Sequence, residues 1–295
     1  MKTEHIGYYI LLFLSALFWG ASFVFTKFLL KDFTVIEIIF IRTALAAFFL
    51  IIFSMLFLKK EMKIEKKDIP IIFAFSFFEP FLYFIFETYS LDYTSASIVS
   101  VIIATIPVFT ALLSKFYFKE QFSTINMMGV LVSFTGIIVM LLPDLTANSS
   151  EFWGALLAFF AVLSAVGYGF YLRKLSKKYN PVVIITYQNT IGVILFLPLF
   201  VVFGVKNGFP ALADLTETSN FINIFILAIF CSSLAFIFFV RGVQLLGLGK
   251  SMVFNNLIPV ITAIISFFLL KEQFTMAKIS GIAIVIIGIF IVQKK

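Results

Sequence analysis

Ten long apolar stretches, separated by short polar connections, limit the fold of this chain more than any other feature. A helix that crosses a lipid bilayer needs about 20 consecutive, mostly apolar residues. We expect such helices near residues 8–29, 35–58, 69–90, 96–118, 124–142, 152–173, 182–203, 221–243, 250–270 and 275–292. The stretches are too long and alternate too little to be strands of a transmembrane β-barrel. The sequence therefore predicts an all-α integral membrane protein with ten transmembrane helices.

The composition supports a lipid environment and excludes several classes of function. Of the 295 residues, 62% are hydrophobic and 13% are charged, whereas a soluble domain has about 45–50% apolar and about 25% charged residues. The net charge of +7 lies on no soluble basic face, so we expect no nucleic-acid partner. A single cysteine, Cys231, and a single histidine, His5, leave no disulfide framework and no metal site. We predict no cofactor and no enzymatic activity.

The distribution of Lys and Arg predicts the orientation, because cytoplasmic loops of membrane proteins are enriched in these residues. With the N-terminus in the cytoplasm, sixteen of the 22 Lys and Arg residues fall on the cytoplasmic side and five on the other, with Arg42 inside a helix. We therefore expect both termini in the cytoplasm and a multi-pass location in the inner (cytoplasmic) membrane.

A repeat divides the chain into two halves. Residues 106–111 return as 258–263, an offset of 152, and the tetrapeptide Lys119–Phe122 returns as Lys271–Phe274. The first helices match at an offset of 149. We predict two five-helix repeats, over residues 1–145 and 146–295. The same offset of 152 relates two pairs of glycines, expected to bring the fifth and tenth helices close together: Gly129 and Gly136, with Gly281 and Gly288.

The odd number of helices in each repeat has a physical consequence. The second copy must enter the membrane from the opposite side, so the two repeats are predicted to be inverted. Inverted repeats are typical of secondary transporters, in which one half rocks against the other around a site near the midplane. The alternative is a duplication that builds a purely structural bundle.

Several short motifs stand in a characteristic order: Phe18-Trp19-Gly20, Phe40-Ile41-Arg42, Tyr93-Thr94-Ser95-Ala96, Pro107 with Lys119-Glu120, and Pro259 with Lys271-Glu272. In this order and doubled spacing the sequence resembles the EamA-type branch of the drug/metabolite transporter superfamily, over about residues 8–142 and 152–292. The resemblance implies a ten-helix bundle that moves small metabolites, often amino acids or related compounds and often outward. It does not identify the substrate. The second copy departs from the first, with Asn189 opposite Arg42, Cys231 opposite Glu79 and Phe239 opposite Glu87, so we expect an asymmetric site.

Three charged residues lie well inside predicted helices: Arg42, Glu79 and Glu87. Because a charge at the bilayer centre costs roughly 2.5–3.5 kcal/mol, such groups face a cavity or a partner. Arg42 and Glu87 are predicted at similar depths, about 10 Å below the outer surface at 1.5 Å per residue. We expect them to form an ion pair between neighbouring helices, which either serves function or only fixes packing.

Glu79 is predicted near the midplane and is followed by Pro80, which loosens the preceding helical turn. A carboxylate there would bind a substrate ammonium or carry a coupling proton. The alternative is a protonated glutamic acid that hydrogen-bonds across helices. Tyr83 lies four residues beyond Glu79 and four before Glu87, on the same helix face.

Other polar and aromatic residues inside the predicted helices complete the candidate binding set. Their amides either line a cavity or join helices by hydrogen bonds, and their aromatic rings offer cation–π surfaces. They are Trp19, Tyr168, Tyr187, Gln188, Asn255 and Asn256.

These observations predict a secondary active transporter, an exporter of small polar metabolites such as amino acids or amine-bearing compounds. It would use alternating access between inverted repeats, with protons as the coupling ion and membrane lipid as its environment, as a monomer or homodimer. One alternative is a membrane-embedded scaffold or accessory subunit. Another is a lipid-handling membrane protein, although an enzyme of that class would need a cluster of Asp, His or paired acids at one interface.

Overall fold

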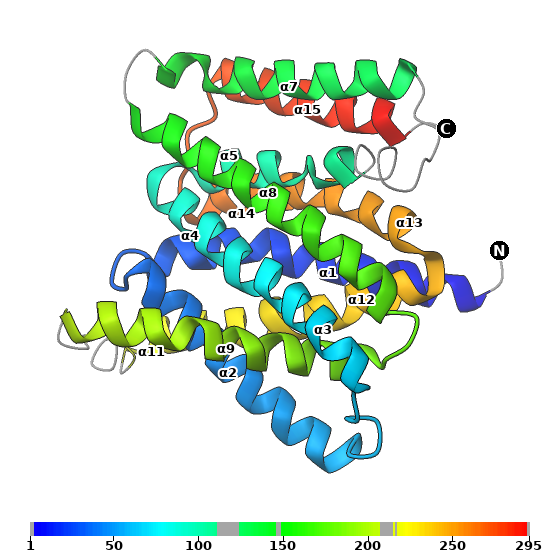
Figure 1. The fold of residues 1–295 in the computed structure, drawn as a ribbon. Helices are drawn as coiled ribbons and strands as arrows, with labels where there is room; N and C mark the ends of the chain where they lie inside the picture. Colours follow the sequence, from blue (N-terminus) through cyan, green and yellow to red (C-terminus); the bar gives the residue numbers. More distant parts are fainter. Residues whose placement is uncertain (1–2, 111–123, 146–148, 207–214, 216, 294–295) are drawn as a thin grey trace.

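The computed structural model describes residues 3–110, 124–145, 149–206, 215 and 217–293. Every regular element within these residues is helical (Figure 1). The first half comprises α1 (Thr3–Leu29), α2 (Val35–Phe57), η1 (Lys66–Asp68), α3 (Ile69–Ser76), η2 (Phe77–Leu82), α4 (Tyr83–Tyr93), α5 (Ala96–Ile103) and α7 (Thr124–Leu145). The second comprises α8 (Ser149–Leu175), α9 (Pro181–Lys206), α11 (Thr218–Ile226), η3 (Leu227–Leu234), α12 (Ala235–Leu246), α13 (Leu248–Met252), η4 (Val253–Leu257), α14 (Ile258–Leu269) and α15 (Met276–Gln293).

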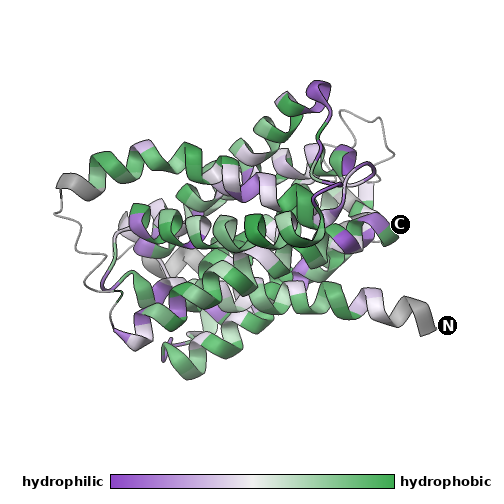
Figure 2. Ribbon diagram, turned by 90° about the horizontal axis from the view of Figure 1, so that it is seen from below, coloured by the Kyte–Doolittle hydropathy of each residue, from purple (hydrophilic) through white to green (hydrophobic). Residues whose placement is uncertain are grey.

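The helices have the length and surface of a membrane protein. Helix is present in each of the ten predicted ranges. In the part of the chain that the structure describes, seven helical stretches are long and apolar enough to cross a membrane, and shorter apolar helices cover Ala96–Thr110, Met127–Val139 and Met276–Ile291. Hydrophobic residues extend along the helices (Figure 2), and large side chains such as Leu56 and Phe268 are 71% exposed. The all-helical fold is confirmed for the described residues and is consistent with a membrane protein. The ten crossings, the inversion of the repeats and the side on which the termini lie stay predictions.

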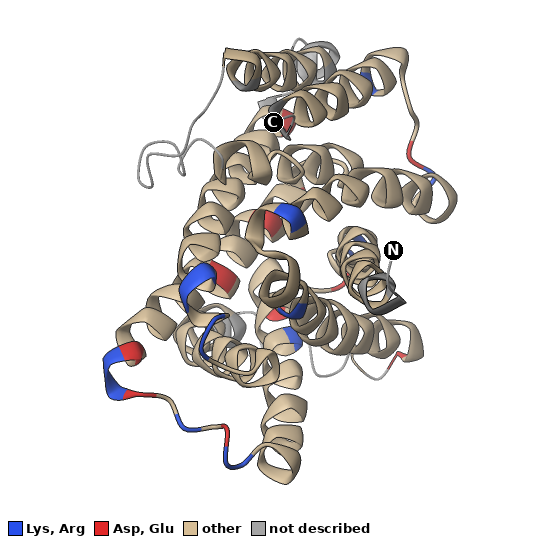
Figure 3. Ribbon diagram, turned by 90° about the vertical axis from the view of Figure 1, so that its right-hand side faces the viewer, with Lys and Arg blue, Asp and Glu red and all other residues tan. Residues whose placement is uncertain are grey.

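Connections that the sequence predicts on one side of the membrane lie together. Helix α1 begins and α15 ends at the same end of the bundle (Figure 1). At this end, charged residues gather on the connections (Figure 3), and Asp68 accepts hydrogen bonds from Lys178 Nζ and Tyr179 Oη. At the other end, Asn220 donates to Asp32 across 3.1 Å. Which end faces the cytoplasm stays a prediction.

The third and eighth predicted helices are both interrupted by a π-helical turn, η2 and η3. Glu79 in η2 and Cys231 in η3 are repeat-related, 152 positions apart. Glu79 has non-helical backbone angles (φ −148°, ψ 118°), and the Glu79–Pro80 peptide bond is cis. The loosening that Pro80 predicts is therefore a full interruption of the helix at Glu79.

Helices α7 and α15 pack against each other at one edge of the bundle (Figure 1). A Cβ atom added at Gly136 would lie 2.6 Å from the backbone nitrogen of Val285, and one added at Gly288 would lie 2.5 Å from the backbone nitrogen of Ser133. The predicted close approach of these helices is confirmed. The first Lys-Glu-Gln-Phe turn, Lys119–Phe122, lies outside the described residues.

Candidate functional site

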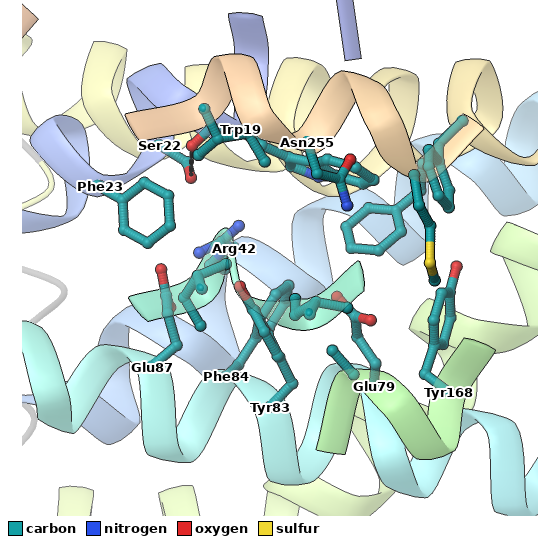
Figure 4. A pocket seen from close by; sticks show the side chains of 17 residues that line it. Trp19, Ser22, Phe23, Arg42, Glu79, Tyr83, Phe84, Glu87, Tyr168 and Asn255 are labelled. Atoms are coloured by element: carbon teal, nitrogen blue, oxygen red, sulfur yellow. Dashed lines mark hydrogen bonds between the residues drawn. The ribbon is translucent and has the colours of Figure 1, made fainter. Parts of the chain in front are cut away.

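A cavity of about 50 Å³ lies between helices of the two halves of the bundle (Figure 4). Seven of the ten predicted binding residues line it: Trp19, Arg42, Glu79, Tyr83, Glu87, Tyr168 and Asn255. The remaining lining residues are Ser22, Phe23, Phe84, Ile103, Ile106, Ala165, Phe236, Phe239, Met252 and Ile258.

Three predicted binding residues do not line this cavity. Tyr187 donates from its hydroxyl to the carbonyl of Met62 at 2.8 Å, in the connection that follows α2. Gln188 and Asn256 are buried elsewhere in the bundle. All three lie within helices that the sequence predicts, and a role of each in binding stays a prediction.

The guanidinium of Arg42 contacts residues of both halves of the chain. Its Nε donates to Ser232 Oγ at 3.0 Å, and its Cζ lies 4.2 Å from the centroid of the Phe84 ring. Its Nη1 has no hydrogen-bond partner among the described residues. The expected ion pair with Glu87 is not formed, and the guanidinium instead contacts Ser232 and the Phe84 ring.

Two carboxylates face the cavity from one helical passage (Figure 4). Glu87 accepts a 3.1 Å hydrogen bond from the neighbouring Thr88 Oγ1. Glu79 lies at the break between α3 and α4, where its carboxylate receives no hydrogen bond from any side chain or backbone group in the described part of the chain. Tyr83 lies between them and points into the same space (Figure 4). Glu79 is thus the acceptor most available to a ligand.

Three hydrogen-bond donors on the cavity wall are buried without a partner among the described residues: Trp19 Nε1, Arg42 Nη1 and Tyr168 Oη. A buried polar group left unsatisfied costs about 1–3 kcal/mol. Such groups persist where a water or a ligand satisfies them. These donors therefore indicate a ligand that carries hydrogen-bond acceptors.

Aromatic rings form much of the remaining wall. The Trp19 ring lies 5.0 Å from that of Phe236 and 5.1 Å from that of Phe239, and Tyr168 stacks on Phe75 at 4.4 Å. Residue type alone does not separate Phe236 and Phe239 from the other 40 of the 42 Phe residues. Their repeat positions are the signal that identifies them, since Phe236 corresponds to Phe84 and Phe239 to Glu87.

Repeat-related positions line the cavity from both sides. Tyr168 lies 149 positions after Trp19, and four further pairs lie 152 positions apart. These pairs are Phe84 and Phe236, Glu87 and Phe239, Ile103 and Asn255, and Ile106 and Ile258. The cavity is therefore built from equivalent positions of the two halves, with its carboxylates in the first half only.

The arrangement offers complementary groups to a small polar molecule. Carboxylates bind an ammonium group, a guanidinium binds a carboxylate, and aromatic faces attract a cation. In the conformation described, however, about 50 Å³ is room for only a few waters, at about 10–15 Å³ each. A metabolite requires the walls to move apart.

Comparison with known proteins identifies the family. The pattern of the EamA-like transporter family matches twice, over residues 6–142 and 152–293. The chain belongs to the EamA-like transporter family. An uncharacterized transporter of Archaeoglobus fulgidus is 25% identical over 97% of this chain and 99% of its own length. The uncharacterized transporter YetK of Bacillus subtilis is 26% identical over 100% of this chain and 90% of its own.

Two further proteins extend the comparison. The chloroplastic WAT1-related protein At3g02690 of Arabidopsis thaliana is 27% identical over 70% of this chain and 51% of its own length. A crystal structure of another protein superposes on this chain with a TM-score of 0.69 at 14% identity, over 97% of this chain and 96% of the other. At this identity the likeness shows a shared fold. Together, these findings make the protein a multi-pass membrane protein of a transporter family.

Proposed function

We propose that this EamA-like protein is a secondary active transporter that exports small polar metabolites, amino acids or amine-bearing compounds, across the cytoplasmic membrane. Two inverted five-helix units would rock against each other and expose the central cavity to each side in turn. One observation carries the proposal. The Glu79 carboxylate and three hydrogen-bond donors lie together in one buried cavity between the two halves, and none of them has a partner among the described residues.

The roles of the individual groups follow from their chemistry. Glu79 binds the substrate ammonium or, when the substrate is absent, a coupling proton. Arg42 offers Nη1 to a substrate carboxylate, while Ser232 holds its Nε. Trp19 and Tyr168 donate to further acceptors of the substrate, and Asn255 adds an amide to the same wall.

The lining by repeat-related positions supports alternating access. A site formed by equivalent positions of the two halves has part of its wall on each moving unit, so a relative rotation changes access without dismantling either unit. The π-helical turns η2 and η3 stand at repeat-related places, where such interruptions allow local adjustment of a helix.

The test is transport by the purified protein in proteoliposomes. A thermal-stability screen against the common amino acids and small amines first selects a ligand, because a ligand that binds the folded state raises its melting temperature. Counterflow of that radiolabelled compound is then measured for the natural protein and for Glu79→Gln. We expect counterflow in the natural protein and its loss, or loss of its pH dependence, in the variant. Equal flux with unchanged pH dependence in the two proteins would refute the role of Glu79.

A further inference from the structure

Outside the cavity, one side chain of the second half is bonded to a helix end of the first. The carboxylate of Glu272, in the turn between α14 and α15, accepts a 2.9 Å hydrogen bond from the backbone N–H of Ala96 and another from Ser97 Oγ. Ser97 Oγ also lies 3.0 Å from Ser266 Oγ of α14. Three contacts thus fasten the start of α5 to the end of α14.

The turn is shaped to deliver this carboxylate. Lys271 has a positive φ of 54°, a conformation uncommon for a residue other than glycine. The N–H of Glu272 donates back to the carbonyl of Ser266 at 3.3 Å. The chain therefore folds over the end of α14 and turns Glu272 toward α5.

The hydrogen bond from Ala96 to Glu272 is favourable because it lies at the N-terminus of α5. Helix α5 has only eight residues, and its own cap, Ser95, makes a long contact of 3.4 Å with the N–H of Ile98. The first N–H groups of a helix lack intrahelical partners and attract negative charge. Hydrogen bonds to an ionised carboxylate are about twice as strong as neutral ones. Glu272 therefore supplies a charged acceptor that α5 lacks within the described part of its own half.

Helices α5 and α14, which these hydrogen bonds join, form two walls of the central cavity. Ile103 at the end of α5 lines it, as does Ile258 at the start of α14. Helices α5 and α14 pack side by side and belong to different repeats. Glu272 therefore joins the halves at the end of the bundle opposite the termini, the end predicted to face outward.

We propose that Glu272 is the outer gating residue of the transport cycle: its bonds to Ala96 and Ser97 hold the cavity closed toward the outside and must release for outward opening. The proposal rests on the alternating access proposed above. It assigns a positioning role to a residue outside the cavity, and it places the moving contact at the junction of α5 with the turn after α14.

Accessibility of the cavity tests this gate without knowledge of the substrate. Cys231 is the single cysteine, so a Cys231→Ser background with Ser22→Cys places one thiol on the cavity wall. A membrane-impermeant maleimide is added to the side of the Glu272 turn in oriented vesicles, and the initial labelling rate is measured. We expect Glu272→Ala to raise this rate about tenfold or more, as loss of charge-assisted hydrogen bonds shifts the equilibrium toward the open state.

The matched control is Glu217→Ala. Glu217 is an exposed glutamate at a helix start on the same end, but its side chain makes no cap hydrogen bond. We expect the labelling rate of the control to equal that of the parent. Ser97→Ala removes one of the two partners of Glu272 and should give a smaller increase, which provides a second measurement if Glu272→Ala folds poorly.

The outcomes separate the gate from the proposed function. A parent protein that is labelled, with unchanged rates in Glu272→Ala and Ser97→Ala, overturns the gate and leaves the transporter proposal in place. Lower melting temperatures with unchanged rates also overturn it, because Glu272 is then a structural cap only. A thiol unreachable from either side in every variant overturns alternating access and the gate together.

Discussion

Arg42 of α2 donates from Nε to the hydroxyl of Ser232 in η3 at 3.0 Å, across the boundary between the two halves. Asn189, which the repeat places opposite Arg42, donates from Nδ2 to the carbonyl of the same Ser232 at 3.3 Å. Two repeat-related side chains therefore converge on one residue of a π-helical turn. Because that turn also interrupts a helix, its movement would carry the guanidinium with it.

Replacing Ser232 should disturb Arg42 more than the loss of one hydroxyl suggests. Ser232→Ala leaves Nε buried without an acceptor, at a cost of about 1–3 kcal/mol. We expect a lower melting temperature and about tenfold weaker binding of a carboxylate-bearing ligand, measured by isothermal titration calorimetry. Ser233→Ala is the control, because Ser233 bonds the carbonyl of Ala228 within its own helical passage. Equal affinities in the two variants would contradict a role of Ser232 in positioning Arg42.

Removing an unpartnered donor should have the opposite effect on stability. In Tyr168→Phe the buried hydroxyl that lacks a partner among the described residues is gone, so the ligand-free protein should melt at an equal or higher temperature. The stabilisation by ligand should shrink, since a donor to the ligand is lost. Tyr187→Phe should show the reverse pattern, because its hydroxyl bonds Met62 outside the cavity. A ligand-induced shift as large in Tyr168→Phe as in the natural protein would exclude that donor from binding.

The sequence predicts the membrane fold and much of the cavity because lipid makes polar residues conspicuous. Glu79 and Arg42 stand out in apolar stretches, and both line the cavity. The repeat register relates Trp19 to Tyr168 and so links two walls. Distance along a helix can be counted at about 1.5 Å per residue, and residues chosen from the middle of predicted helices, such as Arg42 and Glu79, do reach the same cavity.

Rotation about the helix axis is the part that fails. Similar depths in the membrane predict a pair of Arg42 and Glu87, but Ser232 and Phe84 take the guanidinium instead. Tyr187 lies in the expected helix and faces the connection after α2. A helix that is apolar all round carries similar side chains on every face, so its sequence says little about which face turns inward.

The charged cluster at the end of the bundle that carries the termini should make stability depend on pH. Hydrogen bonds from Lys178 and Lys67 lower the pKa of Glu65 from 4.5, and hydrogen bonds to Asp68 and Glu65 raise the pKa of Lys178 above 10.5. A carboxyl group whose pKa is lowered by folding stabilises the fold at pH values above its ordinary pKa, and this stabilisation is lost as the pH falls. A lysine whose pKa is raised by folding stabilises the fold at pH values below its ordinary pKa, and this stabilisation is lost as the pH rises.

The stabilising effect of Lys178 should therefore be greatest between about pH 5 and pH 10. We expect Lys178→Gln to melt at a lower temperature than the natural protein in this window, and the difference to shrink on either side of it. Lys177→Gln, a change at an exposed neighbour, serves as control and should show no such pH-dependent difference. A difference for Lys178→Gln that stays constant across this window and beyond both of its ends would argue against the ion pairs.

A side chain at the glycines between α7 and α15 should destabilise the fold. A methyl group at Gly136 would meet the backbone of Val285 at 2.6 Å and that of Gly281 at 2.8 Å. Because backbone cannot move aside as a side chain does, Gly136→Ala should cost about 1–3 kcal/mol through overpacking and lower the melting temperature in nanodiscs. Gly249→Ala is the control, since nothing lies within 4 Å of its added Cβ and alanine favours helix. Equal melting temperatures in the two variants would show that α7 and α15 separate at little cost.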